Sequence, residues 1–177
     1  MLGVSIPATL EHDLHKFEQA LDELSRALGF AGERPDKEWK EGPDNLWALD
    51  DVNYIVWECK SEVLLSRTEI NKTEAEQMNR SAAWFQKHYQ GCKAVYIEIH
   101  PAYQVQSAGN FLQDVGAMRE RELKAFTRAV RAFFKSFERL NFKDLSLPHI
   151  QNLLGANALT VENLLSGGFT KKTTNLK

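Results

Sequence analysis

Three ionisable residues within residues 42–63 have the types and the spacing needed for metal-assisted hydrolysis. Asp44 precedes one apolar run, and Glu58 and Lys60 end the next apolar run. On a strand, Glu58 and Lys60 share one face, whereas Cys59 takes the other. If the two runs pair as a hairpin, Asp44 returns to the neighbourhood of Glu58. Two acids and a lysine are costly to bury unless something binds them, and a divalent metal is the usual partner.

These residue types suit one reaction in particular, the hydrolysis of a phosphodiester. That reaction needs a nucleophilic water and stabilisation of the charge at phosphorus. A divalent metal held by two carboxylates supplies both, and a lysine can orient the water or lower its pKa. The alternative is an ordinary Asp in a turn and a Glu–Lys pair that reaches solvent. We favour the functional interpretation because Glu58 and Lys60 follow so apolar a run, and buried charges rarely persist without a task.

The surrounding pattern predicts the elements that must position these residues. Apolar periodicity and breaker residues predict an amphipathic helix over about 10–28, a short strand near 30–34, strands near 45–49 and 54–61, a helix over 74–89 and a strand over 94–99. Asn71 or Thr73 is the expected cap of the second helix. The strand–helix–strand unit predicts a parallel pair of strands joined by a right-handed crossover.

The pattern beyond residue 100 predicts a mainly helical extension. We expect a polar loop over 103–110, a helical stretch over 111–140 with a break near Gly116, and two short helices, the second opened by Thr160. Residues 169–177 read as a flexible tail. The sequence therefore predicts a single domain over 1–177, with a core at about 10–100 and a helical extension at about 110–168.

Composition narrows the class of protein. No apolar run approaches the roughly 20 residues that span a bilayer, and no secretory signal is recognisable. The two cysteines, Cys59 and Cys92, lack metal-binding spacing, so a zinc site is not expected. We expect a reduced, cytoplasmic protein or a domain of a larger cytoplasmic chain, with no membrane partner.

Charge is unevenly distributed along the chain. Residues 1–63 hold 14 acids and 6 bases, whereas residues 64–177 hold 10 acids and 16 bases. Eight of those bases lie between residues 119 and 143, and the candidate contacts to nucleic acid are Arg119, Arg121, Lys124 and Arg128. The alternatives are chance segregation of surface charge and a solvated helix face, and the pattern does not separate them from phosphate contact.

The motif resembles that of a known group of enzymes. Pro43-Asp44, thirteen intervening residues and then Glu58-Cys59-Lys60 resemble the motif of the PD-(D/E)XK nuclease superfamily, which includes type II restriction endonucleases, archaeal Holliday-junction resolvases and phage exonucleases. The element order from about Leu10 to His100 also resembles its core. The resemblance implies an α/β, restriction-endonuclease-like fold. Its central mixed four-stranded sheet would be flanked by helices in the order α-β-β-β-α-β, followed by a helical C-terminal extension.

The resemblance also implies roles for the motif residues. Asp44 and Glu58 would bind Mg²⁺ or Mn²⁺, and the backbone carbonyl of Cys59 would complete the inner shell. Lys60 would position the attacking water.

Two helices would add further residues to the site if the resemblance holds. Many members add a glutamate from the first helix, and Glu18 is the best candidate, with Glu23 behind it. Some members carry a glutamine on the crossover helix in a Q-x-x-x-Y pattern. Gln77 matches the glutamine, whereas position 81 is Ser rather than Tyr.

The expected function is therefore that of a Mg²⁺-dependent nuclease acting on nucleic acid, DNA before RNA, as an endo- or exonuclease. The chain is also similar to nuclease modules of bacterial helicase-like proteins, so a helicase-like region, a partner subunit or a second copy of the chain are candidate partners. The alternative is a catalytically silent nucleic-acid-binding or protein-interaction module with the same fold. A third interpretation is a structural subunit that docks through the Phe-rich face of residues 126–140.

Overall fold

The structure is a computed structural model that describes residues 8–60, 66–138, 140, 141, 143 and 145–176. Its helices and strands follow the chain in this order: α1 (Ala8–Ala27), β1 (Ala31–Glu33), α2 (Pro35–Glu38), β2 (Asn45–Ala48), β3 (Asn53–Cys59), β4 (Glu69–Ile70), α3 (Lys72–His88), β5 (Lys93–Ile99), β6 (Gln104–Val105), β7 (Val115–Met118), α4 (Glu120–Phe137), α5 (Leu147–Ala156), α6 (Val161–Leu165), β8 (Lys171–Lys172) and β9 (Thr174–Asn175).

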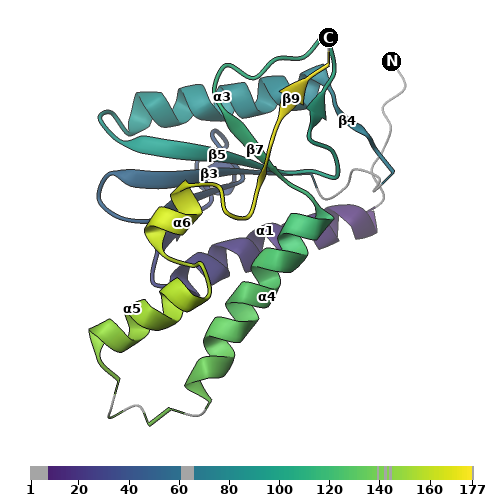
Figure 1. Cartoon of the computed structure of the whole chain (residues 1–177). Helices are drawn as coiled ribbons and strands as arrows, with labels where there is room; N and C mark the ends of the chain where they lie inside the picture. Colours follow the sequence, from purple (N-terminus) through teal and green to yellow (C-terminus); the bar gives the residue numbers. More distant parts are fainter. Residues whose placement is uncertain (1–7, 61–65, 139, 142, 144, 177) are drawn as a thin grey trace.

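A mixed sheet of six strands forms the centre of the molecule, in the order β1-β2-β3-β5-β7-β8. The strands β1, β2 and β3 form an antiparallel meander, β3, β5 and β7 run parallel, and β8 is antiparallel to β7. Helix α3 covers one face of the sheet, whereas α1 and α4 lie on the other face (Figure 1). A second, three-stranded sheet has the order β4-β6-β9.

Strand β3 shows why the sequence gives this layered arrangement. Ile55 and Trp57 belong to the hydrophobic core beneath α1 and α4, whereas Val56 packs with Met78 and Phe85 of α3. Because both faces are covered, nearly every position of the strand is apolar. Full burial of each large apolar side chain stabilises the fold by roughly 1.5–3 kcal/mol. The same alternation directs Glu58 toward the α3 face.

The crossover unit agrees with the sequence prediction. Strands β3 and β5 pair in parallel, and α3 connects them. Asn71 is the N-cap of α3, and it forms a capping box with Glu74, in which each side chain bonds the other residue's backbone N–H. The predicted order of the main elements up to residue 99 is confirmed, as are the two short helices near the C-terminus.

Two predictions about the sheet and the extension are wrong. The main sheet has six strands rather than four. Residues Val115–Met118, which the helical pattern over 111–140 includes, form β7 parallel to β5 instead. A four-residue apolar segment has no strong preference of its own, so its pairing with a buried strand decides its structure. The helix begins only at Glu120.

The C-terminal segment is also more ordered than the sequence predicts. The sequence predicts a flexible tail over residues 169–177, whereas β8 pairs with β7 and β9 pairs with β6. The predicted loop over 103–110 likewise contains β6. These short strands depend on pairing with distant residues, and no local sequence pattern predicts them. No helix in the described part of the chain combines the length and apolar character needed to cross a membrane.

Gly42 fixes the path of the chain into β2. Its φ is +94°, and a Cβ atom there would lie 2.8 Å from the Trp84 ring and 2.9 Å from Pro35. An L side chain would therefore meet both an unfavourable backbone conformation and a steric clash. Since Asp44 follows two residues later, this glycine positions the start of the candidate site.

We expect Gly42→Ala to destabilise the protein by about 2–4 kcal/mol, since backbone strain and overpacking add. For a chain of this length, that change lowers the melting temperature by roughly 4–16 °C, as measured by circular dichroism. Gly155→Ala is the matched control, because Gly155 lies in α5 and has no atom within 4 Å of an added Cβ. The control should be neutral or stabilising by up to about 1 kcal/mol. Equal melting temperatures for Gly42→Ala and the wild type would contradict this account.

Candidate functional site

The antiparallel register of β2 and β3 brings Asp44 opposite Glu58. Asn45 pairs with Trp57 and Leu46 with Val56, so the next pair in this register is Asp44 with Glu58. Opposite residues of an antiparallel pair have Cβ atoms about 4.5–5.5 Å apart. The Asp44 Oδ2 atom accepts a hydrogen bond of 2.7 Å from the backbone N–H of Cys59. The structure therefore brings together the two predicted metal-binding acids.

Three side chains hold the carboxylate of Glu58. The Lys60 Nζ atom lies 3.2 Å from Oε2, and the Gln77 side-chain amide donates to the same oxygen at 2.7 Å. The Ser81 hydroxyl donates to Oε1 at 2.5 Å. Gln77 and Ser81 are four residues apart on α3, so they occupy the same helix face. The resemblance implies Gln77 in this site. It does not imply Ser81, which occupies the position of Tyr in the Q-x-x-x-Y pattern.

Glu98 is a further acid of this site that sequence reasoning missed. It pairs with Glu58 in the parallel register of β3 and β5, and its side chain is completely buried. Neither of its carboxylate oxygens has a hydrogen-bond partner among the described residues. The sequence does contain a signal for Glu98. The same spacing of a glutamate and a basic residue, Glu58-x-Lys60 and Glu98-x-His100, ends two apolar strands that the sequence predicts to be parallel.

The acids outnumber the cations in this buried cluster. Burial, together with the charge of Glu58, raises the pKa of Asp44 to about 8. Burial also raises the pKa of Glu98 to about 8, against the opposing effect of Lys60. Burial lowers the pKa of Lys60, but the three neighbouring carboxylates outweigh it, and the net pKa is raised. One lysine ammonium therefore faces three carboxyl groups.

A second network lies beside this cluster, at the N-terminus of α3. The Nδ1 atom of His100 accepts a hydrogen bond from the Ala102 backbone N–H, and its Nε2 atom lies 3.6 Å from Glu74 Oε2. Burial raises the pKa of Glu74, but the neighbouring His100, the backbone N–H of Asn71 and the charge of Arg67 lower it below its ordinary value. Glu74 is thus held as a charged, hydrogen-bonded cap, which fixes the end of α3 that carries the site.

Glu18 lies near the site but is engaged by cations. Its side chain is buried, and Arg34 Nη2 lies 2.5 Å from its Oε2 atom, with Lys37 Nζ at 3.7 Å. The charge of Glu18 raises the pKa of Asp44 less than burial and the charge of Glu58 do. Glu23 lies on the exposed side of α1 and accepts a hydrogen bond from Gln19. The structure brings Glu18 to the site's vicinity and leaves Glu23 outside it.

The predicted nucleic-acid contacts lie along α4, which begins directly after β7. Arg119 makes two hydrogen bonds with Glu122, at 2.8 and 2.7 Å, so its guanidinium is already paired. Arg121, Lys124 and Arg128 are exposed, and Lys124 pairs with a neighbouring glutamate. The C-terminal ends of β3, β5 and β7 lie in register, so α4 leaves the same edge of the sheet that carries the acidic cluster.

The donor set decides whether a metal ion fits. Among the described residues, no group of three or more His, Cys, Asp or Glu side chains could hold a metal ion. Asp44 and Glu58 would therefore have to share it with a backbone carbonyl and water. That arrangement suits Mg²⁺, which binds one or two carboxylates and keeps several waters. The unpartnered oxygens of Glu98 and the excess of buried acids also fit a nearby divalent cation.

The buried acids predict how stability depends on pH in the absence of metal. The folded-state pKa values of Asp44 and Glu98, about 8, exceed the ordinary 3.8 and 4.5, so the folded protein keeps protons that the unfolded chain releases. This contribution to stability is complete below about pH 4 and is lost as the pH rises to about 8. Each group contributes a slope of at most about 1.4 kcal/mol per pH unit. We therefore expect the melting temperature, measured in EDTA, to fall as the pH rises from 5 to 8.

Glu98→Gln is the matched variant for this prediction. Glutamine keeps the shape of the side chain but does not titrate. The number of protons released on unfolding should therefore fall by up to one, and the free energy of unfolding should depend less steeply on pH. Stability that rises across this pH range in EDTA, or a slope unchanged in Glu98→Gln, would contradict the assigned pKa directions.

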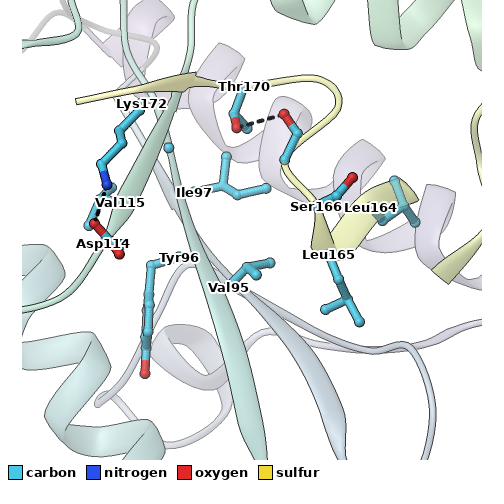
Figure 2. A pocket seen from close by; sticks show the side chains of 12 residues that line it. Val95, Tyr96, Ile97, Asp114, Val115, Leu164, Leu165, Ser166, Thr170 and Lys172 are labelled. Carbon is cyan, nitrogen blue, oxygen red and sulfur yellow. Dashed lines mark hydrogen bonds and ion pairs between the residues drawn. The ribbon is translucent and has the colours of Figure 1, made fainter. Parts of the chain in front are cut away.

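A separate cavity of about 300 Å³ lies on the opposite face of the sheet, between β5, β7 and α6. Val95 and Ile97 form part of its wall, Thr170 bonds back to the carbonyl of Gly167, and Lys172 pairs with Asp114 at its rim (Figure 2). None of the acidic cluster lines this cavity, so it supplies no group to the chemistry considered above.

The comparisons with known proteins leave the chain without an assigned family: no family model, curated protein or solved structure matches it.

Proposed function

We propose that the chain is a metal-dependent nuclease that hydrolyses phosphodiester bonds of nucleic acid, with DNA preferred to RNA. The observation that carries this proposal is the buried cluster in which three carboxyl groups, from Asp44, Glu58 and Glu98, face the single ammonium of Lys60. Such an excess of buried acid is unfavourable unless protons or a cation compensate it. A site that hydrolyses phosphodiesters needs such a cation to activate water and to stabilise the charge at phosphorus.

The residues would divide the work in the following way. Asp44 and Glu58, with the carbonyl of Cys59, would hold Mg²⁺ or Mn²⁺. A bound divalent cation would polarise the phosphate and acidify a water. Lys60 would hold that water by a charge-assisted hydrogen bond, since its raised pKa keeps the ammonium charged. Gln77 would fix the Glu58 carboxylate from α3.

Ser81 would act as a positioning residue for the same carboxylate. Its hydroxyl and the Gln77 amide bond to different oxygens of Glu58, so they fix both the position and the rotation of the group. A carboxylate that is held in this way needs no reorganisation when a cation binds.

The restriction-endonuclease-like assignment of the fold forms part of this proposal. The order α1-β1-β2-β3-α3-β5 agrees with the helix, meander, crossover helix and strand of that core. The position of the acids supports it as well, because Glu58 lies at the end of the meander, directly before the crossover, and Asp44 lies opposite it in the register of β2 and β3. The strands β7 and β8 would then be additions to the four-stranded core.

The exposed bases of α4 would contact the phosphates of the substrate. Arg121, Lys124 and Arg128 are spaced by three and four residues, so they lie on one face of the helix. Because α4 leaves the sheet at the edge that carries the acids, a strand bound along it would pass close to the site.

The test of this function is a cleavage assay with end-labelled single-stranded and duplex DNA and RNA. We expect cleavage of at least one substrate in Mg²⁺ or Mn²⁺, and none in EDTA. Readdition of the metal should restore cleavage. A protein that stays folded but cuts none of these substrates in either metal would contradict the proposal.

One observation favours the second candidate, a silent binding module with the same core. The Glu58 carboxylate already accepts hydrogen bonds from three side chains, and Asp44 is bonded to the backbone of Cys59. Such a network can hold Glu58 without a cation if Asp44 and Glu98 are protonated. This candidate predicts nucleic-acid binding that metal does not change and that is never followed by cleavage.

A further inference from the structure

A cavity of about 470 Å³ lies outside the acidic cluster and is lined mainly by aromatic rings. Its lining residues are Trp39, Glu41, Trp84, His88 and Tyr89. This volume falls within the range of about 300–1,000 Å³ typical of sites for small ligands. The nuclease proposed above assigns no task to any of these five residues.

The rings form one continuous group around Trp84. The Trp39 ring stacks on Trp84 at 5.7 Å between centroids and 24° between planes, and the His88 ring stacks on Trp84 at 4.7 Å and 26°. The Tyr89 ring lies 6.0 Å from Trp84, tilted by 51°. The side chain of Trp39 is nevertheless 52% exposed, whereas Trp47 is fully buried. A large aromatic surface is thus available to a ligand.

The backbone that carries the exposed ring is conformationally restricted. Trp39 is the C-cap of α2, and its backbone N–H donates a hydrogen bond to the carbonyl of Pro35. Lys40 follows with a φ of 61°. Gly42 then passes directly against the Trp84 ring. This short and conformationally restricted turn gives a preformed wall, which lowers the entropy lost on binding.

One carboxylate lines the cavity and a second is bonded to a lining residue. Glu41 lines it, and the Glu33 carboxylate accepts a hydrogen bond of 2.9 Å from the Tyr89 hydroxyl. Burial raises the pKa of Tyr89 well above its ordinary value, and the charges of Glu33 and Glu38 raise it further. Neither a lysine nor an arginine is among the residues that line the cavity. A phosphate-bearing ligand would meet repulsion here, whereas a cation would be attracted.

We propose that this cavity binds an organic cation, a methylated or quaternary ammonium group carried by a small molecule or by a lysine of a peptide. The negative faces of Trp and Tyr rings attract such cations, and a nearby carboxylate strengthens the attraction. Methyl groups on the nitrogen match the apolar character of the rings. The proposal concerns a surface separate from the acidic cluster and does not depend on nuclease activity.

The test uses the full chain and the indole N–H signals of its four tryptophans in a ¹H–¹⁵N spectrum. The probes are tetramethylammonium, a trimethyl-lysine peptide, its unmodified form, and AMP. We expect the first two probes to shift the Trp39 and Trp84 signals while Trp47 and Trp57 stay unchanged, since the latter are buried elsewhere. Tighter binding of the trimethyl-lysine peptide than of tetramethylammonium would identify a peptide as the source of the cation.

Variants separate binding from folding. Trp39→Ala should weaken tetramethylammonium binding by about three- to thirtyfold, Trp39→Phe should restore part of it, and Glu41→Gln should weaken it severalfold. Leu112→Ala is the matched control, because Leu112 is 78% exposed and does not line the cavity. Asp44→Asn should bind the cation normally whether or not it cleaves nucleic acid.

The outcomes that overturn the proposal are equally direct. Shifts of Trp39 and Trp84 with AMP but not with tetramethylammonium would assign the cavity to a nucleobase. The absence of any shift with millimolar tetramethylammonium or the trimethyl-lysine peptide would remove the site altogether.

Discussion

Asp44→Asn is expected to lower the rate of metal-dependent cleavage by roughly a thousandfold or more, because several kcal/mol of transition-state stabilisation depend on the metal. Asparagine has the same shape, so its side-chain oxygen can still accept the bond from the Cys59 N–H. What it removes is the negative charge that would hold the ion. The measurement is a multiple-turnover assay in saturating Mg²⁺ on the best substrate of the cleavage panel.

The control for this variant is Asp51→Asn, since Asp51 is exposed in the turn of the same hairpin. Its rate should lie within about twofold of the wild type. Fluorescence anisotropy with the same oligonucleotide should show that Asp44→Asn still binds. Cleavage by Asp44→Asn at the wild-type rate would contradict the assigned role of Asp44, and loss of both cleavage and folding would be revealed by its circular dichroism spectrum.

Lys60→Met is expected to give the largest change in stability, a loss of about 3–5 kcal/mol in the free energy of unfolding. The Lys60 side chain is buried, and its ammonium is 3.2 Å from the fully buried Glu58 carboxylate. Removal of one partner leaves the other as an uncompensated buried charge, which is more damaging than removal of both. Urea denaturation at pH 7 in EDTA measures the change.

Two further variants isolate the charge effect from the loss of the side chain. Lys72→Met removes a lysine whose ion pair with Glu76 is largely exposed, so it should change stability by less than about 1 kcal/mol. The double variant Glu58→Gln/Lys60→Met should recover part of the loss of the single variant, because the Glu58 charge is removed together with its partner. Wild-type stability of Lys60→Met would contradict the buried pair.

The sequence predicts the central hairpin and its acids because their placement is a local matter. Two apolar runs separated by a short turn pair in one register, and that register brings Asp44 opposite Glu58. The crossover helix and the position of Gln77 follow in the same way from periodicity and capping. These features need no information from distant parts of the chain.

The features that the sequence does not predict depend on contacts between distant residues. Glu98 joins the site through the parallel register with β3, forty residues away in the chain. Glu18 meets Arg34 only once α1 has packed beside β1, and that ion pair engages the carboxylate that the resemblance would add to the site. The short strand β7 exists because β5 offers it an edge.

The most direct test of the proposed metal site is a crystal of the protein soaked in Mn²⁺, with anomalous diffraction recorded near the manganese edge. We expect one strong anomalous peak, from an ion bound by the carboxylates of Asp44 and Glu58 and by the carbonyl of Cys59, with the Lys60 ammonium beside it. An absence of anomalous density at this position in millimolar Mn²⁺, with Asp44 still bonded to the Cys59 N–H, would contradict it.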